Sequence, residues 1–159
     1  MRILGIDPGF GRLGIGVIDV ENGKETYVYS ECFETSPKET FHNRLKELGE
    51  KIGSICTTWQ PKNASVETLF FEKNQKTAMN VAEARGVIVY ELLRNNVPVF
   101  DYSPLQVKMA LTGFGKAEKS QVAFMTEKLL HLEKATRIDD ELDALALAIT
   151  HSSSSRKTY

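Results

Sequence analysis

The chain has 159 residues, 42% of them hydrophobic and 26% charged, which is the size and composition of one globular domain. A domain of this length can bury a core without disulfides or structural metals. No apolar run approaches the roughly 20 residues that cross a bilayer, and the first residues lack the pattern of a signal peptide. We therefore expect a cytoplasmic protein that spans no membrane. The formal net charge of -1 gives no sign of a nucleic-acid ligand.

The first third of the chain predicts three antiparallel strands and then a helix. Residues 2–7 are a short apolar run that ends in the turn sequence Asp7-Pro8-Gly9. A second strand is expected over residues 15–20. Asn22-Gly23 is a strong hairpin signal, and a third strand follows it through residue 33. From about residue 39, apolar residues recur at helical spacing as far as Trp59.

The remaining elements alternate between strands and helices. We expect strands at 63–69 and 97–100 and helices at about 75–95, 104–111, 118–131 and 139–151. This order predicts an α/β fold with a mixed five-stranded sheet, three antiparallel strands followed by two parallel ones, flanked by helices. Residues 1–151 form one domain in this scheme, and the polar tail 152–159 is expected to be disordered.

The last predicted helix contains the most informative residues. It is apolar nearly all round over 142–149, so we expect it to be largely buried, yet Asp143 lies within that run. A lone ionised carboxylate there is costly unless it is paired, neutralised or bound to a metal. Asp140 lies one turn earlier, about 5–6 Å away between Cβ atoms. A preference of acids for helix N-termini accounts for Asp139 and Glu141, but not for Asp143.

Two further acids lie where strands should be buried. Asp7 ends the first strand and Glu67 lies within the fourth. If these two strands are parallel neighbours, both carboxylates come to one end of the sheet. Each acid alone is explained equally well as a strand-end charge that faces solvent. Together with Asp140 and Asp143, they predict a cluster of hard oxygen ligands suited to Mg²⁺ or Mn²⁺.

An ordered set of short motifs covers almost the whole chain. The segments are Ile6-Asp7-Pro8-Gly9, Gly14-Ile15-Gly16, Val66-Glu67-Thr68-Leu69-Phe70 with Lys73-Asn74, Ala84-Arg85-Gly86, Gln106-Val107-Lys108, Ala117-Glu118-Lys119-Ser120-Gln121-Val122 and the run from Asp140 to His151. Each segment is weak evidence alone, and the ordered set is specific. It resembles the RuvC family of Holliday junction resolvases, the crossover junction endodeoxyribonucleases, whose fold is ribonuclease H-like.

The resemblance implies an endonuclease that resolves four-way DNA junctions by paired, symmetric cuts with two Mg²⁺ ions, for which Mn²⁺ can substitute. The catalytic and metal-binding carboxylates it implies are Asp7, Glu67, Asp140 and Asp143. It places Lys119 beside the scissile phosphate as a further catalytic group. The DNA-binding residues it implies are Phe70, Lys73, Arg85, Lys108 and Lys119. Glu72 departs from the expected pattern, because it puts an acid in a loop that should lie beside DNA.

The resemblance also implies protein partners. Members of the family are homodimers, and they act with the RuvA and RuvB branch-migration proteins. Apolar residues on more than one face of the helix predicted over 75–95 agree with a dimer contact, and burial under another helix of the same chain explains them equally well.

Three other interpretations use the same residues. Actin-like ATPases and sugar kinases also begin with a strand, an Asp and a glycine-rich hairpin, but they use two such lobes and lack paired acids in a last helix. A YqgF-like relative of the same fold would act on RNA. A non-catalytic junction-binding protein would hold a structural metal.

Overall fold

The computed structural model describes residues 1–69, 75–132 and 138–155. The strands are β1 (Arg2–Asp7), β2 (Arg12–Glu21), β3 (Lys24–Glu34), β4 (Asn63–Glu67) and β5 (Val99–Tyr102). The helices are α1 (Phe41–Trp59), α2 (Gln75–Arg94), α3 (Pro104–Thr112), α4 (Lys119–Leu129) and α5 (Asp139–Ser155). No helix among the described residues is long and apolar enough to cross a bilayer.

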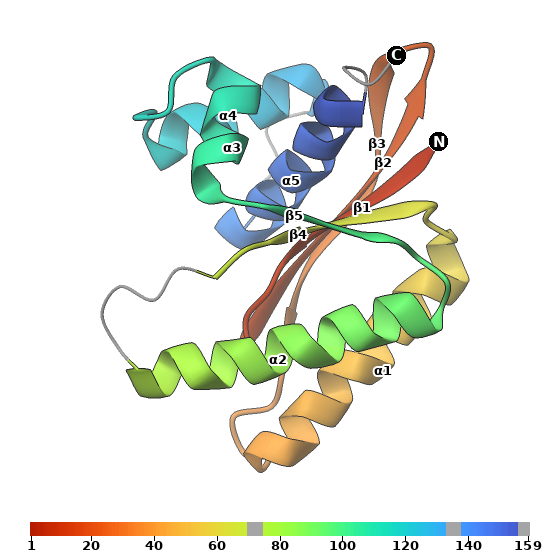
Figure 1. Cartoon of the computed structure of the whole chain (residues 1–159), viewed down its shortest axis with the longest axis vertical. Coiled ribbons are helices and arrows are strands. Elements are labelled where there is room, and N and C mark those ends of the chain that lie inside the picture. The colour runs from red at the N-terminus through yellow and green to blue at the C-terminus, as the bar shows by residue number, and fades with distance from the viewer. Residues whose placement is uncertain (70–74, 133–137, 156–159) are drawn as a thin grey trace.

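The strands form one five-stranded sheet in the order β3-β2-β1-β4-β5 (Figure 1). β2 pairs antiparallel with both β1 and β3, whereas β1, β4 and β5 run parallel to one another. The predicted mixed sheet of three antiparallel and two parallel strands is therefore confirmed. β1 is the central strand, because it joins the antiparallel half to the parallel half.

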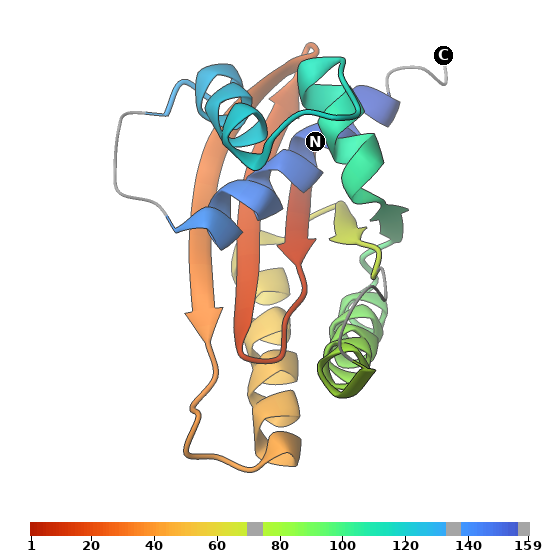
Figure 2. The ribbon, with the colours of Figure 1, turned by 90° about the vertical axis from the view of Figure 1, so that its left-hand side faces the viewer.

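Helices cover both faces of this sheet. α1 and α2 lie against one face, and α5 crosses the other with α3 and α4 packed outside it (Figures 1 and 2). Alternate side chains of each strand point to opposite faces. Leu4 and Ile6 of β1 accordingly belong to the core with α1 and α2, whereas Ile3 belongs to the core with α5.

Several element boundaries differ from the predicted ones. β4 ends at Glu67 instead of residue 69, and α4 ends at Leu129 instead of residue 131. β2 begins three residues earlier, at Arg12, and β5 covers Val99–Tyr102 instead of residues 97–100. α5 continues to Ser155, so the predicted disordered tail was wrong for residues 152–155, and residues 156–159 lie outside the described part of the chain.

The serines of this last turn explain the error. Serine is usually a weak helix former because its hydroxyl competes for backbone groups. Here the Ser154 hydroxyl donates to the Thr150 carbonyl at 2.9 Å, within the helix. The Ser152 hydroxyl donates to Glu25 of β3 at 2.7 Å, and Ser152 is buried. Tertiary contacts therefore hold a polar run in helical form.

Glycines bring the backbone of α5 into direct contact with β1 and β2. A Cβ atom at Gly5 would lie 1.8 Å from the Ala144 carbonyl oxygen. A Cβ atom at Gly14 would lie 2.2 Å from the Asp140 carbonyl oxygen and 3.0 Å from the Cβ atom of Asp7. Real Cβ atoms do not approach backbone so closely, so only glycine permits this packing.

Gly5→Ala should therefore destabilise the fold strongly, by about 3 kcal/mol or more, because a rigid backbone has to move to admit the methyl group. Gly53→Ala is the matched control. Gly53 lies in the interior of α1, and its added Cβ would meet its nearest neighbour at 3.8 Å. There alanine should raise stability by up to about 1 kcal/mol. Urea denaturation of both variants checks this, and equal stabilities would contradict the packing of α5.

Candidate active site

The carboxyl ends of two parallel strands bring Asp7 and Glu67 together. The last paired residues of β1 and β4 are Ile6 and Val66, and each acid is the next residue along its strand. Ile6 and Val66 belong to the core with α1 and α2. Because strand side chains alternate, Asp7 and Glu67 face the opposite side, where α5 lies.

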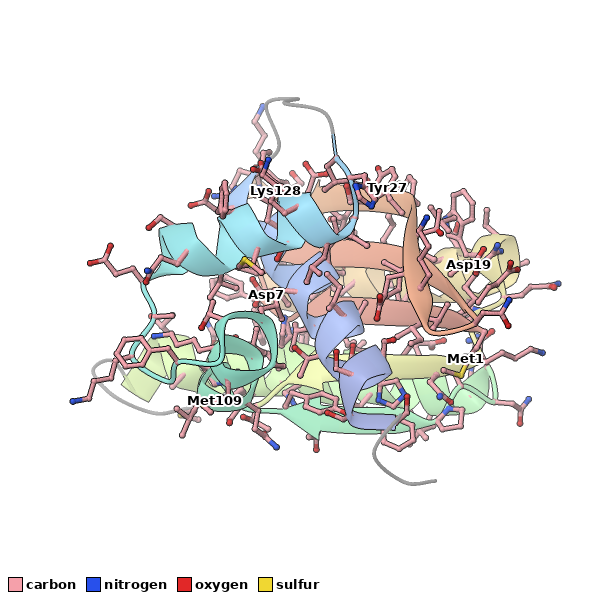
Figure 3. The ribbon with its side chains drawn as sticks, turned by 90° about the horizontal axis from the view of Figure 1, so that it is seen from above. Met1, Asp7, Asp19, Tyr27, Met109 and Lys128 are labelled. Atoms are coloured by element: carbon pink, nitrogen blue, oxygen red, sulfur yellow. The ribbon has the colours of Figure 1, made fainter. Side chains whose placement is uncertain are left out.

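The first turns of α5 supply the other two acids. Ser30 of β3 donates its hydroxyl to Glu141 at 2.6 Å, which ties this end of the helix to the sheet. Asp143 is half-buried and lines a pocket of about 440 Å³ together with Asp7 and Glu67. Figure 3 shows Asp7 from above, among α3, α4 and α5. Three of the four predicted carboxylates thus share one pocket.

The remaining walls of this pocket come from α3, α4 and α5. Lys108 and Lys119 line it beside the acids. The apolar lining residues are Pro104, Val107, Val122 and Leu147. The pocket therefore combines negative charge at the strand ends, two lysines and apolar walls.

The crowding of acids is unfavourable while they are charged. Burial raises the pKa of Asp7 from its usual 3.8 to about 7, and the charges of the three neighbouring acids act in the same direction. Burial also raises the pKa of Glu67 and of Asp143. These raised pKa values mean that the nearby positive charge does not fully offset the burial and mutual repulsion of the carboxylates. A divalent cation would supply that charge.

Two of the acids are instead paired with cationic side chains. The Lys119 ammonium lies 2.7 Å from Asp143 and 4.0 Å from the exposed Asp139. The Arg12 guanidinium lies 2.7 Å from Asp140, whose carboxylate is outside the lining of the pocket. In the described part of the chain, no three acids, histidines or cysteines converge closely enough to hold an ion. The donor chemistry nevertheless fits a hard cation, because carboxylate oxygens of three acids line one pocket.

Arg85 of α2 has a structural role that the sequence did not indicate. Its Nε atom donates to the Glu67 carbonyl oxygen at 3.1 Å, and its guanidinium forms an ion pair with Asp101 of β5. It therefore holds the end of β4, and with it Glu67, against α2 and β5. Phe70, Glu72 and Lys73 lie outside the described residues.

Sequence reasoning also missed Arg12. Pairing of β1 with β2 places Gly14 opposite Asp7, so Arg12 lies just beyond the strand end that carries the acids. The predicted hairpin was enough to place Arg12 near Asp7. The contact of Arg12 with Asp140 could not be predicted, because it depends on the position of α5.

The fold and the pocket define a class of protein. A ribonuclease H-like sheet that presents carboxylates and lysines in one pocket is the framework of a nuclease. A family model described as "Crossover junction endodeoxyribonuclease RuvC" matches residues 3–151, and the chain belongs to this family. Its activity is that of the family, the endonucleolytic resolution of Holliday junctions in DNA recombination and repair. The family is one of divalent-metal-dependent nucleases.

Relatives support this assignment over nearly the full length. The chain is 46% identical over 151 residues to the RuvC endonuclease of Brevibacillus brevis, covering 95% of this chain and 91% of the relative. It is 41% identical to the RuvC endonuclease of Thermotoga petrophila, covering 98% and 94%. The solved structure of Thermus thermophilus RuvC in complex with a Holliday junction substrate matches with a TM-score of 0.92 at 35% identity, covering 99% and 96%.

The raised pKa of Asp7 predicts how metal-free stability depends on pH. The unfolded chain loses this proton near pH 4 and the folded chain near pH 7, so the contribution of Asp7 to stability falls as pH rises between these values. Asp7→Asn should therefore stabilise the metal-free protein, on the order of 2 kcal/mol at pH 8 and less at pH 5. Urea denaturation in the presence of a chelator measures this gain.

Asp19→Asn is the control for this prediction. Asp19 lies at the other end of the same strand pair, where its hydrogen bonds with Arg2 lower its pKa. Its removal should leave stability unchanged or lower it slightly at pH 8. A loss of stability in Asp7→Asn at pH 8 would contradict the unfavourable burial and repulsion of the charged Asp7 carboxylate.

Proposed function

We propose that this chain cuts four-way DNA junctions with two Mg²⁺ ions held by Asp7, Glu67, Asp140 and Asp143. The observation that carries the proposal is the pocket in which Asp7, Glu67 and Asp143 meet Lys119. The similar Thermus thermophilus protein has been solved in complex with a Holliday junction substrate, which supports the same substrate here. Such ions supply an activated water and stabilise the leaving 3′-oxygen of a phosphodiester. The products would be a 5′-phosphate and a 3′-hydroxyl.

The chain's own residues have distinct tasks in this proposal. The four carboxylates bind the ions, and Arg85 holds Glu67 in place through the backbone. Lys119 leaves Asp143 when substrate enters and donates to an oxygen of the scissile phosphate, where negative charge develops. The apolar walls of the pocket limit access of bulk water. Lys108 lies at the same pocket and would bind the phosphate backbone.

The remaining DNA contacts and the partners are supported by family membership. Phe70 would stack on an unpaired base of the junction and Lys73 would contact its backbone. The Arg85 guanidinium could reach DNA only by leaving Asp101. A homodimer would place two active sites on one junction for paired cuts. RuvA and RuvB would be the partners of this homodimer. A role in DNA recombination would place the protein in the cytoplasm.

One face of α2 is available for the dimer contact. Ala84, Ile88 and Leu92 of this helix are buried in the core. Tyr90 and Leu93 are exposed on the rest of its surface. Large apolar side chains that remain in solvent on one helix favour a contact with a second protein surface. Burial within the same chain would also have explained the sequence pattern, but Tyr90 and Leu93 are exposed.

Asp143→Asn should abolish junction cleavage and leave junction binding intact or stronger, because it removes a metal ligand and reduces repulsion of phosphate. Asp139→Asn is the matched control on the same helix, since the Asp139 side chain is 79% exposed and that of Asp143 only 29%. It should cut at close to the normal rate. Cleavage is measured in millimolar Mg²⁺ and binding in Ca²⁺. Normal cutting by Asp143→Asn would refute the carboxylate assignment.

Lys119→Ala should slow single-turnover cleavage at saturating protein by around a hundredfold, the cost of losing an electrostatic donor to the transition state. The control is Lys128→Ala, on the same helix at its far end. Figure 3 shows Lys128 pointing away from Asp7, and its ammonium lies over the Phe124 ring. That variant should bind and cut normally. Equal cleavage rates in the two variants would remove Lys119 from the catalytic residues and leave the four carboxylates to act alone.

A further inference from the structure

Among the cationic side chains that the structure describes near the acids, Arg12 has a contact that neither the sequence motifs nor family membership predicted. It is the first residue of β2 and follows the turn after Asp7. Its Nη2 atom lies 2.7 Å from Oδ2 of Asp140, and its Nε atom lies 3.7 Å from Oε1 of Glu34. The Arg12 side chain is 48% exposed and that of Asp140 is 24% exposed. A metal ligand in the proposed mechanism is therefore already bound by a guanidinium.

The packing of the backbone brings the side chains of Arg12 and Asp140 together. β2 pairs with β3 so that Arg12 lies opposite Glu34, and it pairs with β1 so that Gly14 lies opposite Asp7. Gly14 lets the backbone of Asp140 come against the sheet, since any Cβ there would lie 2.2 Å from the Asp140 carbonyl oxygen. Arg12 and Gly14 are two residues apart and so face the same side of β2. The guanidinium is thereby held at the Asp140 carboxylate.

We propose that Arg12 is a positioning residue that acts through Asp140: it neutralises and orients this carboxylate in the metal-free protein and has to give it up when a divalent cation binds. This inference rests on the proposed function, in which Asp140 is a metal ligand. Arg12 thereby weakens the binding of the ion that Asp140 holds. Glu34 lies close enough to receive the displaced guanidinium, so Arg12 keeps a negatively charged neighbour after the exchange.

The chain offers a matched ion pair at the opposite end of the same two strands. Arg2 of β1 and Asp19 of β2 are also 2.7 Å apart, and both side chains are partly exposed. Figure 3 shows Asp19 well separated from Asp7. Arg2→Gln therefore removes the same charge and the same kind of contact without touching the acids of the pocket.

The test is Mn²⁺ binding to the DNA-free protein, followed by the electron paramagnetic resonance signal of free Mn²⁺ at constant ionic strength. Arg12→Gln should bind Mn²⁺ about two- to fivefold more tightly, the range that loss of a competing, partly exposed ion pair supports. Arg2→Gln should bind as the unchanged protein does, and Arg12→Lys should restore most of the original affinity. Equal affinity in Arg12→Gln and the unchanged protein would overturn the proposal, and so would an equal gain in Arg2→Gln.

A second pair of variants separates this inference from the proposed function. Asp140→Asn should weaken Mn²⁺ binding, and Arg12→Gln added to it should then change nothing further. If the Arg12→Gln gain persists without Asp140, Arg12 acts by general charge and the inference is wrong while the carboxylate site stands. If Asp140→Asn binds Mn²⁺ as tightly as the unchanged protein, Asp140 is no ligand, and the proposed four-carboxylate site fails together with the inference.

Discussion

The contact between the backbone of α5 and the central strands is the constraint on which the site depends. Asp7 and Glu67 are already neighbours through β1 and β4, but Asp140 and Asp143 come from the far end of the chain. They reach the strand ends because Gly5 and Gly14 leave room for the carbonyl groups of Ala144 and Asp140. A single methyl group in this contact would separate the acids of the helix from those of the sheet.

The same contact makes the site electrostatically costly. Carboxylates that are crowded beneath a buried helix repel one another, and the pKa of Asp7 rises to about 7 as a result of this repulsion and, above all, of burial. The apolar cores on both faces of the sheet offset that cost. Lys119 and Arg12 reduce it further by pairing with Asp143 and Asp140. The crowded acids therefore lower the stability of the metal-free protein, and they concentrate negative charge to which a divalent cation can bind.

Glu67 and the first turn of α5 are also held in place by residues outside the set of four acids. Arg85 ties the backbone of Glu67 to α2 and β5, and Ser30 ties the first turn of α5 to β3. These contacts come from strands and helices and not from long loops, so they hold the acids on rigid elements. The two lysines, in contrast, come from α3 and from the start of α4, in the outer layer of the fold. The carboxylates therefore lie on the central elements of the fold, and the lysines lie on the helices packed outside them.

The sequence by itself determined the mixed sheet and predicted the four acids as candidate ligands, because both follow from local signals: alternation in strands, helical spacing, turn residues, and an acid inside the apolar run of the last helix. The tertiary structure alone decided the partners of those acids. Arg12 with Asp140 and Arg85 with Glu67 join residues from different elements, and no local pattern encodes such a pair. It also decided that residues 152–155 are helical, since the contact of Ser152 with Glu25 forms only after α5 has packed on the sheet.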